Sequence, residues 1–291
     1  MDGQRRDALI AAMPAVFVGI WSTGFVVARF GMPHAPPLTF LAWRYALSIV
    51  AFLVWIALAR AIWPRDRAQW LHLAVAGVLI HAGYLGGVWA AVRDGLGAGT
   101  TALIVGLQPV LTALWVSASG QERRVSARRW LGLALGLAGL LLVVWRKLGV
   151  GEVTAFNLGC ALFALLAITA GTLYQKRYVA PCDVRTANTV QLLAALAVTA
   201  PLAAFETGAV EMHPELIGAM LWSVFALTLG GSSLLYMLIQ RGAATRVTSL
   251  MYLVPPCTAL LAWLLFGEAL GVLVLIGLAI TALGVALVVR G

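Results

Sequence analysis

Residues 102–114 read ALIVGLQPVLTAL, and residues 248–260 read TSLMYLVPPCTAL, so an apolar run with proline near its centre occurs twice in the chain. Pro109 aligns with Pro255 at an offset of 146 residues (255 minus 109). The same alignment, with a gap of one residue before the glycines, pairs Thr112 with Thr258, Glu122 with Glu268, Gly132 with Gly277, and Gly139 with Gly284. Self-similarity of this kind predicts an internal duplication.

The chain around this duplication has the composition of a membrane protein. It has 291 residues, 62% hydrophobic and 11% charged, with a mean hydropathy of +0.95. Apolar runs of about 20 residues, the length that crosses a bilayer core, recur throughout the chain. There are ten of them, near 8–30, 38–60, 70–92, 99–119, 128–146, 156–176, 186–206, 215–240, 245–266 and 271–289. The sequence therefore predicts an all-α polytopic membrane protein with ten transmembrane helices in a single transmembrane domain, 1–291.

The duplication divides these runs into two sets of five, residues 1–147 and residues 148–291. An odd number of spans per half makes the second half enter the membrane from the side opposite to the first. We therefore predict two inverted five-helix repeats around a central cavity, the usual construction of secondary transporters.

Basic residues predict the orientation. If the N-terminus is cytoplasmic, cytoplasmic segments hold 15 of the 20 basic residues: Arg5, Arg6, Arg60, Arg65, Arg67, Arg123, Arg124, Arg128, Arg129, Lys176, Arg177, Arg185, Arg241, Arg246 and Arg290. The opposite side holds Arg29, Arg93, Arg146 and Lys147. This asymmetry places both termini in the cytoplasm. Basic loops that face anionic lipid account for the net charge of +9, and we expect no nucleic-acid partner.

Metal, cofactor and catalytic chemistry have little support in the sequence. Three cysteines show no framework spacing, and we expect neither a disulfide nor a metal. The four histidines, His34, His72, His81 and His213, are expected far apart in depth, and no nucleophile and base pair stands out. We predict that the chain is not an enzyme and holds no cofactor.

These features together resemble the EamA-type families of the drug/metabolite transporter superfamily. The resemblance lies in the five-plus-five repeat, the Gln-Pro or Pro-Pro pair in the fourth span of each half, the acidic residue after that span (Glu122, Glu268) and the glycine-rich fifth span. Within the superfamily, the chain is most similar to the YddG type of aromatic amino-acid exporter. The resemblance implies a bacterial inner-membrane exporter of amino acids that works by alternating access.

The prolines are the first candidates for function. A proline inside a span frees a backbone carbonyl and bends the helix, which membranes tolerate beside cavities or neighbouring polar groups. We expect Pro109, Pro255 and Pro256 to bend their spans symmetrically about the cavity. Gln108 either lines that cavity or bonds a neighbouring helix.

In the first half, four side chains are candidate substrate ligands. His81 lies near the middle of its span, where an ionisable residue indicates function, and Tyr84 lies one turn further on. Trp21 lies deep in the first span and either stacks on the substrate or simply packs. Arg44 either pairs with a substrate carboxylate or extends to the membrane surface.

In the second half, the sequence LTLGGSSLLYMLIQ begins at residue 227. Gly230 and Gly231 are expected to interrupt a long span as a hinge, and Ser233 and Tyr236 to supply hydroxyl groups beside it. Serine hydroxyls in membrane helices also bond their own backbone. Two further substrate candidates are Tyr252 and Tyr174.

No acidic residue falls at the middle of a predicted span, so the carboxylate that proton or sodium coupling commonly uses is missing. This favours facilitated export of a small amphipathic metabolite. The alternatives are an exporter of cationic drugs or quaternary compounds, which would normally need a buried carboxylate, and a passive channel-like facilitator. Beyond its substrate and membrane lipid, the chain needs no partner, and we expect that it can act as a monomer.

Overall fold

Every element in the described part of the chain is a helix. The computed structural model describes residues 2–118, 127–148, 151–234 and 253–290, and no strand occurs among them. The first half contains α1 (Asp2–Gly31), α2 (Pro37–Ala59), α3 (Arg67–Gly77), η1 (Val78–Leu85), α4 (Gly86–Arg93), α5 (Ala98–Val105), α6 (Gln108–Ala118) and α7 (Ala127–Leu148). The second contains α8 (Ala155–Tyr178), α9 (Val184–Ala203), α10 (Pro214–Leu221), η2 (Trp222–Ser232), α13 (Val254–Phe266) and α14 (Val272–Arg290). The two elements named η are π-helices.

The apolar helices confirm an all-helical membrane architecture. Six are long and apolar enough to cross a bilayer: Pro37–Ala59, Arg67–Arg93, Trp130–Lys147, Ala155–Tyr178, Val184–Ala203 and Pro214–Ser232. Four shorter apolar helices are Ala15–Gly31, Ala98–Thr112, Val254–Phe266 and Val272–Leu287. Together these segments of the described chain fall on the ten predicted runs.

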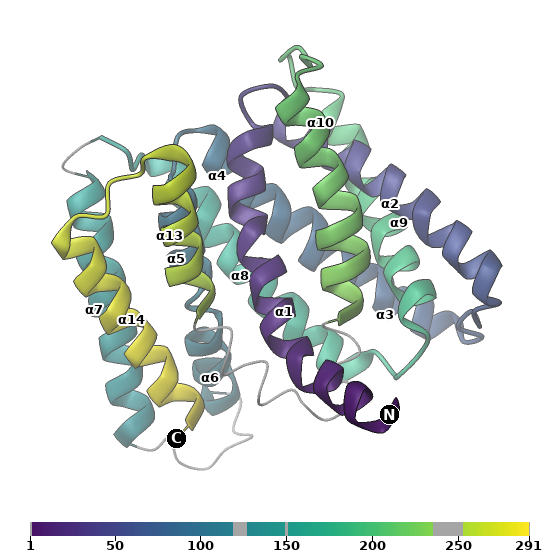
Figure 1. Cartoon of the computed structure of the whole chain (residues 1–291), viewed down its shortest axis with the longest axis horizontal. Coiled ribbons are helices and arrows are strands. Elements are labelled where there is room, and N and C mark those ends of the chain that lie inside the picture. The colour runs from purple at the N-terminus through teal and green to yellow at the C-terminus, as the bar shows by residue number, and fades with distance from the viewer. Residues whose placement is uncertain (1, 119–126, 149–150, 235–252, 291) are drawn as a thin grey trace.

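The starts of the two halves lie at opposite ends of the molecule. Arg93 donates a hydrogen bond to the backbone oxygen of Met32, just after α1, and the Thr154 hydroxyl, just before α8, donates to the Asp94 carboxylate at 2.8 Å. The end of α1 therefore meets the start of α8. Because the 30 residues of α1 rise about 45 Å, its own start lies at the far end. Figure 1 shows both chain termini at that far edge.

The prolines of the repeated stretch lie in the first turns of helices of the described chain, and their bending of the spans stays a prediction. The fourth span breaks at Gly106 and Leu107, and Pro109 is the second residue of α6. Pro255 lies in the first turn of α13. Proline is well suited to a first helical turn, where its missing N–H leaves no backbone acceptor unpaired. Pro256 follows it in the same turn.

Glycine faces join α7 to α14, which pack along each other at one side of the molecule (Figure 1). A Cβ atom built on Gly284 would lie 2.4 Å from the backbone nitrogen of Gly136. One built on Gly139 would lie 2.5 Å from the backbone oxygen of Gly277. The two backbones therefore approach too closely for any side chain at these positions, so these glycines allow α7 and α14 to pack.

Carboxylates cap the helices at their ends. Glu206 accepts hydrogen bonds from the backbone nitrogens of Leu38 and Thr39 at 2.9 and 2.8 Å, at the start of α2. Glu268 accepts one from the nitrogen of Ala98, at the start of α5. Asp183 caps α9, and its hydrogen bonds from the Arg185 guanidinium lower the pKa of the carboxyl below its ordinary value. These carboxylates stabilise helix N-termini, where negative charge is favoured.

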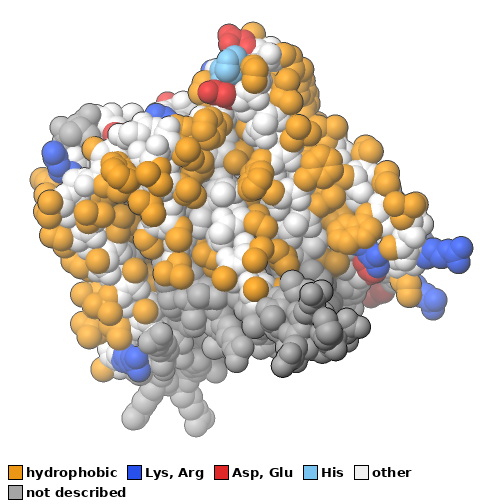
Figure 2. Space-filling model, viewed as in Figure 1, with side chains coloured by type: hydrophobic (Ala, Val, Ile, Leu, Met, Phe, Trp, Pro, Cys, Tyr) orange, Lys and Arg blue, Asp and Glu red, His pale blue; other side chains and the backbone are white. Residues whose placement is uncertain are grey.

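Large apolar side chains cover much of the outer face that Figure 2 shows, with the coloured charged groups gathered towards the ends of the molecule. Exposed side chains of this kind include Trp145, Phe205, Leu58 and Trp115. An apolar flank between charged ends is what a bilayer requires. Inside, the largest buried cluster contains Trp89, Tyr45, Phe17, Phe40 and Phe52.

Candidate functional site

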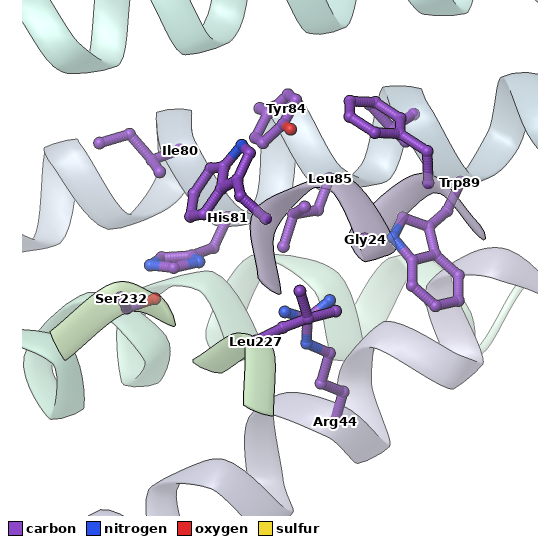
Figure 3. Close-up of a pocket in the computed structure, with 12 residues that line it drawn as sticks. Gly24, Arg44, Ile80, His81, Tyr84, Leu85, Trp89, Leu227 and Ser232 are labelled. Atoms are coloured by element: carbon purple, nitrogen blue, oxygen red, sulfur yellow. The ribbon is translucent and has the colours of Figure 1, made fainter. Parts of the chain in front are cut away.

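A cavity of about 50 Å³ lies between the helices of the two halves. Residues of α1, α2, η1, α4 and η2 line it: Trp21, Gly24, Phe25, Arg44, Ile80, His81, Tyr84, Leu85, Val88, Trp89, Leu227 and Ser232 (Figure 3). Four of these, Trp21, Arg44, His81 and Tyr84, are candidates from the sequence. The fold thus brings together residues from three spans of the first half and one of the second.

Arg44 extends inwards to the cavity, and this excludes its extension to the membrane surface. Arg44 is only 6% exposed. Nε and one terminal nitrogen donate to the Thr228 hydroxyl at 3.2 and 3.1 Å, and that hydroxyl in turn donates to the Ser223 backbone oxygen at 2.8 Å. A guanidinium has five N–H donors, so Thr228 engages only part of its capacity.

The positive charge of Arg44 has no acidic counterpart in the cavity. No carboxylate of the described chain lies within ion-pair distance of the guanidinium, and no lining residue is acidic. A buried cation at this depth is costly unless it is paired or marks a functional pathway. The cavity therefore has the charge that an anionic group requires.

His81 lies in the middle of η1, and a hydrogen bond to its backbone oxygen helps to hold it in place. The Tyr45 hydroxyl donates to the His81 backbone oxygen at 2.8 Å, and the two rings meet edge to face at 6.1 Å. The Nε2 atom of His81 is buried and has no hydrogen-bond partner among the described residues. Figure 3 shows the imidazole directed towards Ser232 of η2. It is available to bind a polar group inside the cavity.

Aromatic side chains form much of the remaining wall. Trp89 stacks on Phe40 with ring centroids 4.3 Å apart, and Trp21 packs against Phe17 at 5.2 Å. Tyr84 is almost fully buried. Rings fixed in this way offer large apolar faces at little entropic cost.

Two π-helices face the cavity, one from the third helix of each half. The lining residues of η1 are Ile80, His81, Tyr84 and Leu85, and those of η2 are Leu227 and Ser232. Wider helical turns of this kind are rare and frequently lie at functional sites. η2 continues through Gly230 and Gly231, so the helix does not end at these glycines, and their role as a hinge stays a prediction. A Cβ atom on Gly231 would meet the Trp21 ring at 3.9 Å, so these glycines bring η2 close to α1.

The other candidates lie away from the lining. Gln108 donates to the Thr172 hydroxyl of α8 at 3.0 Å, which is the helix-bonding alternative. The Tyr174 hydroxyl bonds Nδ1 of His72 at 2.8 Å, outside the cavity. Ser233 is buried next to the lining residue Ser232, and its hydroxyl has no partner in the described chain. Tyr236 and Tyr252 fall outside the described residues.

Sequence reasoning missed Tyr45 and Thr228. Tyr45 follows Arg44 directly, so its proximity to the buried guanidinium was a usable signal. Thr228 and Ser232 flank the Gly-Gly pair in the second half, and only the packing of η2 against α2 places them near residues of the first half. Trp89 stands near the outer end of its span in the sequence and gave a weak signal.

The structure also corrects the expected spacing of the histidines. His34, after α1, and His213, before α10, are stacked with ring centroids 4.3 Å apart and planes inclined by 13°. Loops that are 179 residues apart in the sequence (213 minus 34) meet at this point. The positions of the two residues along the predicted spans do not predict this contact.

A bundle of apolar helices in two halves, with a cavity between them that contains a buried arginine and histidine, defines a multi-pass membrane transporter. Comparison with known proteins agrees with this class. The EamA-like transporter family matches residues 8–145 and again residues 156–290, and the chain belongs to that family. The double match shows that the family domain is duplicated in this chain.

Relatives share about a quarter of their residues with the chain. A probable amino-acid metabolite efflux pump of Salmonella typhimurium is 24% identical over 96% of both chains. The inner membrane transporter YedA of Escherichia coli is 25% identical over 97% of this chain and 91% of its own, and the Bacillus subtilis transporter YvbV is 26% identical over the same shares. A crystal structure at 18% identity covers 94% of both chains with a TM-score of 0.68, which shows the same fold.

Proposed function

We propose that the chain exports a small amphipathic metabolite with a carboxylate, most favourably an aromatic amino acid, across the bacterial inner membrane by alternating access. The observation that carries this proposal is Arg44, a buried guanidinium directed into a cavity that has aromatic walls and no acidic lining residue. The termini lie in the cytoplasm, as the distribution of basic residues predicts. The Salmonella typhimurium relative, described as a probable amino-acid metabolite efflux pump, supports the cargo class.

Arg44 selects the charge of the cargo. A guanidinium binds a carboxylate through paired N–H donors, and in a buried site such bonds are strong and directional. Thr228 leaves donors free for this purpose. The same charge repels a cation, and the lining has no carboxylate to offset it. This argues against export of cationic drugs, the alternative within the transporter class.

Aromatic walls select the body of the cargo. Trp21, Tyr84 and Trp89 offer ring faces for an apolar or aromatic side chain. His81, whose buried Nε2 has no partner in the described chain, and Ser232 are lining groups that can accept a hydrogen bond from the amino group of a zwitterion. One guanidinium, which can bind one carboxylate, together with apolar rings suits a single amino acid. A polyphosphorylated compound would need several buried cations.

Movement of the helices is part of the proposal. The cavity of about 50 Å³ admits a few water molecules, and sites for drug-sized ligands measure roughly 300–1,000 Å³. An amino acid with an aromatic side chain therefore needs the lining helices to separate. In an inverted repeat, rocking one half against the other opens the site to either side.

The direct test is transport by purified protein in liposomes. Vesicles are loaded with labelled tryptophan, phenylalanine, threonine or a quaternary ammonium drug, and efflux is followed with and without a proton gradient. We expect saturable movement and counterflow of tryptophan and phenylalanine, and none of the drug. If no amino acid leaves the vesicles faster than it leaves loaded vesicles without protein, the proposed cargo is wrong. Flux without saturation would indicate a pore.

Arg44 is tested in the same vesicles. Arg44→Gln removes the charge, and because hydrogen bonds to charged groups contribute about 1.5–3 kcal/mol, we expect the apparent KM for tryptophan to rise roughly 10- to 100-fold. Arg44→Lys keeps the charge but not the paired donors and should fall between Arg44→Gln and wild type. Arg65→Gln, in the exposed α2–α3 loop, is the matched control. Wild-type kinetics in folded Arg44→Gln would remove Arg44 from the site.

A further inference from the structure

Two histidines and two glutamates meet at the end of the molecule opposite the termini, in two loops. His34 lies in the α1–α2 loop, and Glu211, His213 and Glu215 lie in the α9–α10 connection or the first turn of α10. Figure 2 shows histidine and acidic groups gathered beside the exposed tip near α10. None of these residues lines the cavity, and the proposed transport site does not use them.

The ligand atoms are close enough to share one ion. One nitrogen from each histidine and one oxygen of Glu215 all lie within 4.8 Å of one another. His34 Nε2 is 3.0 Å from the Glu215 carboxylate, and His213 Nδ1 is 3.9 Å from it. Tetrahedral zinc with bonds of about 2.0–2.2 Å needs ligand atoms roughly 3.3 Å apart. Side-chain movements of up to about 1.5 Å would therefore bring the ligand atoms to this spacing.

The backbone holds the two loops in register without any metal. The Glu211 nitrogen donates to the His34 backbone oxygen at 2.8 Å, which ties the loops together. Prolines stiffen both sides: Pro33 and Pro36 flank His34, and Pro214 follows His213. Proline fixes φ and reduces the freedom that a ligand loop would lose on binding.

A second carboxylate stands where a metal-binding histidine normally has one. When Nε2 of an imidazole binds a metal, Nδ1 carries the proton and donates it, commonly to a carboxylate. His34 Nδ1 is buried, has no hydrogen-bond partner in the described part of the chain, and lies 3.8 Å from Glu211. An unfilled imidazole nitrogen facing a carboxylate is the arrangement that metal binding at Nε2 would complete.

We propose that His34, His213 and Glu215 bind a divalent transition-metal ion, with Glu211 orienting His34, and that this ion fastens the α1–α2 loop to the α9–α10 loop. Two imidazoles and a carboxylate are the ligands that zinc prefers, with copper or nickel as chemically similar competitors. Magnesium and calcium, which prefer oxygen ligands, fit this set poorly.

The position of the ion gives it a role in transport, an inference that rests on the proposed function. The helices next to the fastened loops carry cavity residues: α1 carries Trp21, α2 carries Arg44, and α10 leads into η2 with Ser232. Opening the cavity towards this end would draw those helices apart. Zinc at the loops is therefore expected to slow export from the outer side.

Binding is measured first, without transport. Protein free of any histidine tag is purified in detergent, treated with chelator, and titrated with ZnCl₂ by calorimetry. We expect one zinc ion per chain in wild type. In the variant with both His34→Gln and His213→Gln, affinity should fall more than about 100-fold, since even an orienting partner contributes about 10- to 100-fold. His72→Gln, which changes a histidine bonded to Tyr174 elsewhere, is the control and should bind as wild type.

Two further measurements keep the proposal testable if the double variant does not fold. Glu211 is 75% exposed, so Glu211→Gln should fold normally and weaken zinc binding about 10- to 100-fold. Wild-type protein without saturable zinc binding, or Glu211→Gln and the folded double variant binding as wild type, would overturn the site. In vesicles that export tryptophan, external zinc should slow wild-type efflux and spare the double variant. Binding without slowing would overturn the fastening role alone, whereas absence of tryptophan efflux without zinc concerns the proposed function.

Discussion

Single residues in this protein carry charge to places where the bilayer makes it costly. Arg44 is the clearest case, because its guanidinium lies inside the helix bundle with a neutral hydroxyl as its described side-chain partner. A cation placed so deeply costs several kcal/mol in a lipid environment. That cost is understandable if an anionic cargo offsets it during each transport cycle.

Glu206 places a negative charge at a helix end, the start of α2. Its carboxylate accepts three hydrogen bonds, from the backbone nitrogens of Leu38 and Thr39 and from the Thr39 hydroxyl at 2.8 Å. Glu206→Gln replaces one acceptor oxygen by a donor and removes the charge, so α2 should lose about 1 kcal/mol of stabilisation. We expect the Tm in detergent to fall by roughly 2–4 °C.

The control for this prediction lies in the same loop. Glu211→Gln changes a carboxylate that is 75% exposed, and with chelator present its Tm should match that of wild type. Equal melting temperatures for Glu206→Gln and Glu211→Gln would show that the Glu206 cap contributes nothing to stability.

At the scale of elements, glycines decide how closely helices approach, whereas prolines decide where they begin. Each π-helix is associated with a Gly-Gly pair in corresponding helices of the two halves: Gly86–Gly87 directly follow η1, and Gly230–Gly231 lie within η2. At Gly87, a Cβ atom would lie 2.6 Å from the backbone oxygen of Cys160 on α8. Close approach of this kind lets a widened helix lie directly against its neighbours beside the cavity.

The α7–α14 pair gives an element-scale prediction. Gly284→Ala places a Cβ atom where the Gly136 backbone nitrogen is 2.4 Å away, so the two helices must move apart. Overpacking of this kind costs about 1–3 kcal/mol, and thermal melting should show a lower Tm.

A matched substitution separates packing from helix propensity. A Cβ atom on Gly159 of α8 meets nothing within 4 Å, so Gly159→Ala should leave the Tm unchanged or raise it, because alanine favours helix over glycine. A Gly284→Ala protein as stable as Gly159→Ala would argue that α7 and α14 do not touch through their backbones.

At the scale of the whole molecule, the two halves start at opposite ends. The contacts Arg93 to Met32 and Thr154 to Asp94 fix this relation. In an inverted repeat with a shared cavity, equivalent helices of the two halves can exchange roles as the site opens to one side and then to the other.

Orientation in the membrane follows from this relation and can be measured in intact cells. Single cysteines are introduced at three exposed positions, Arg65→Cys, Ala155→Cys and Ala209→Cys, with the native cysteines replaced. An impermeant maleimide should label residues 155 and 209 from outside, and residue 65 only after the membrane is opened, because basic loops stay in the cytoplasm. Labelling of residues 65 and 155 from the same side would contradict the inverted arrangement.

The sequence by itself determined the class of fold and the number and order of apolar helices. Hydrophobic length is set by the bilayer, so ten runs and their duplication could be read directly from residues such as Pro109 and Pro255. His81, Tyr84, Trp21 and Arg44 could be proposed for the cavity because polar or aromatic groups deep in a span have few other places to be.

Only the tertiary structure decided which of those groups meet. Whether Arg44 turns inwards, whether Gln108 bonds α8, and whether Pro109 lies in the first turn of a helix depend on how helices rotate and pack, and apolar spans carry little periodic signal for rotation. The meeting of His34 and His213 depends on two loops from different halves. Contacts between residues so distant in the chain arise from packing of the whole bundle, and local sequence cannot encode them visibly.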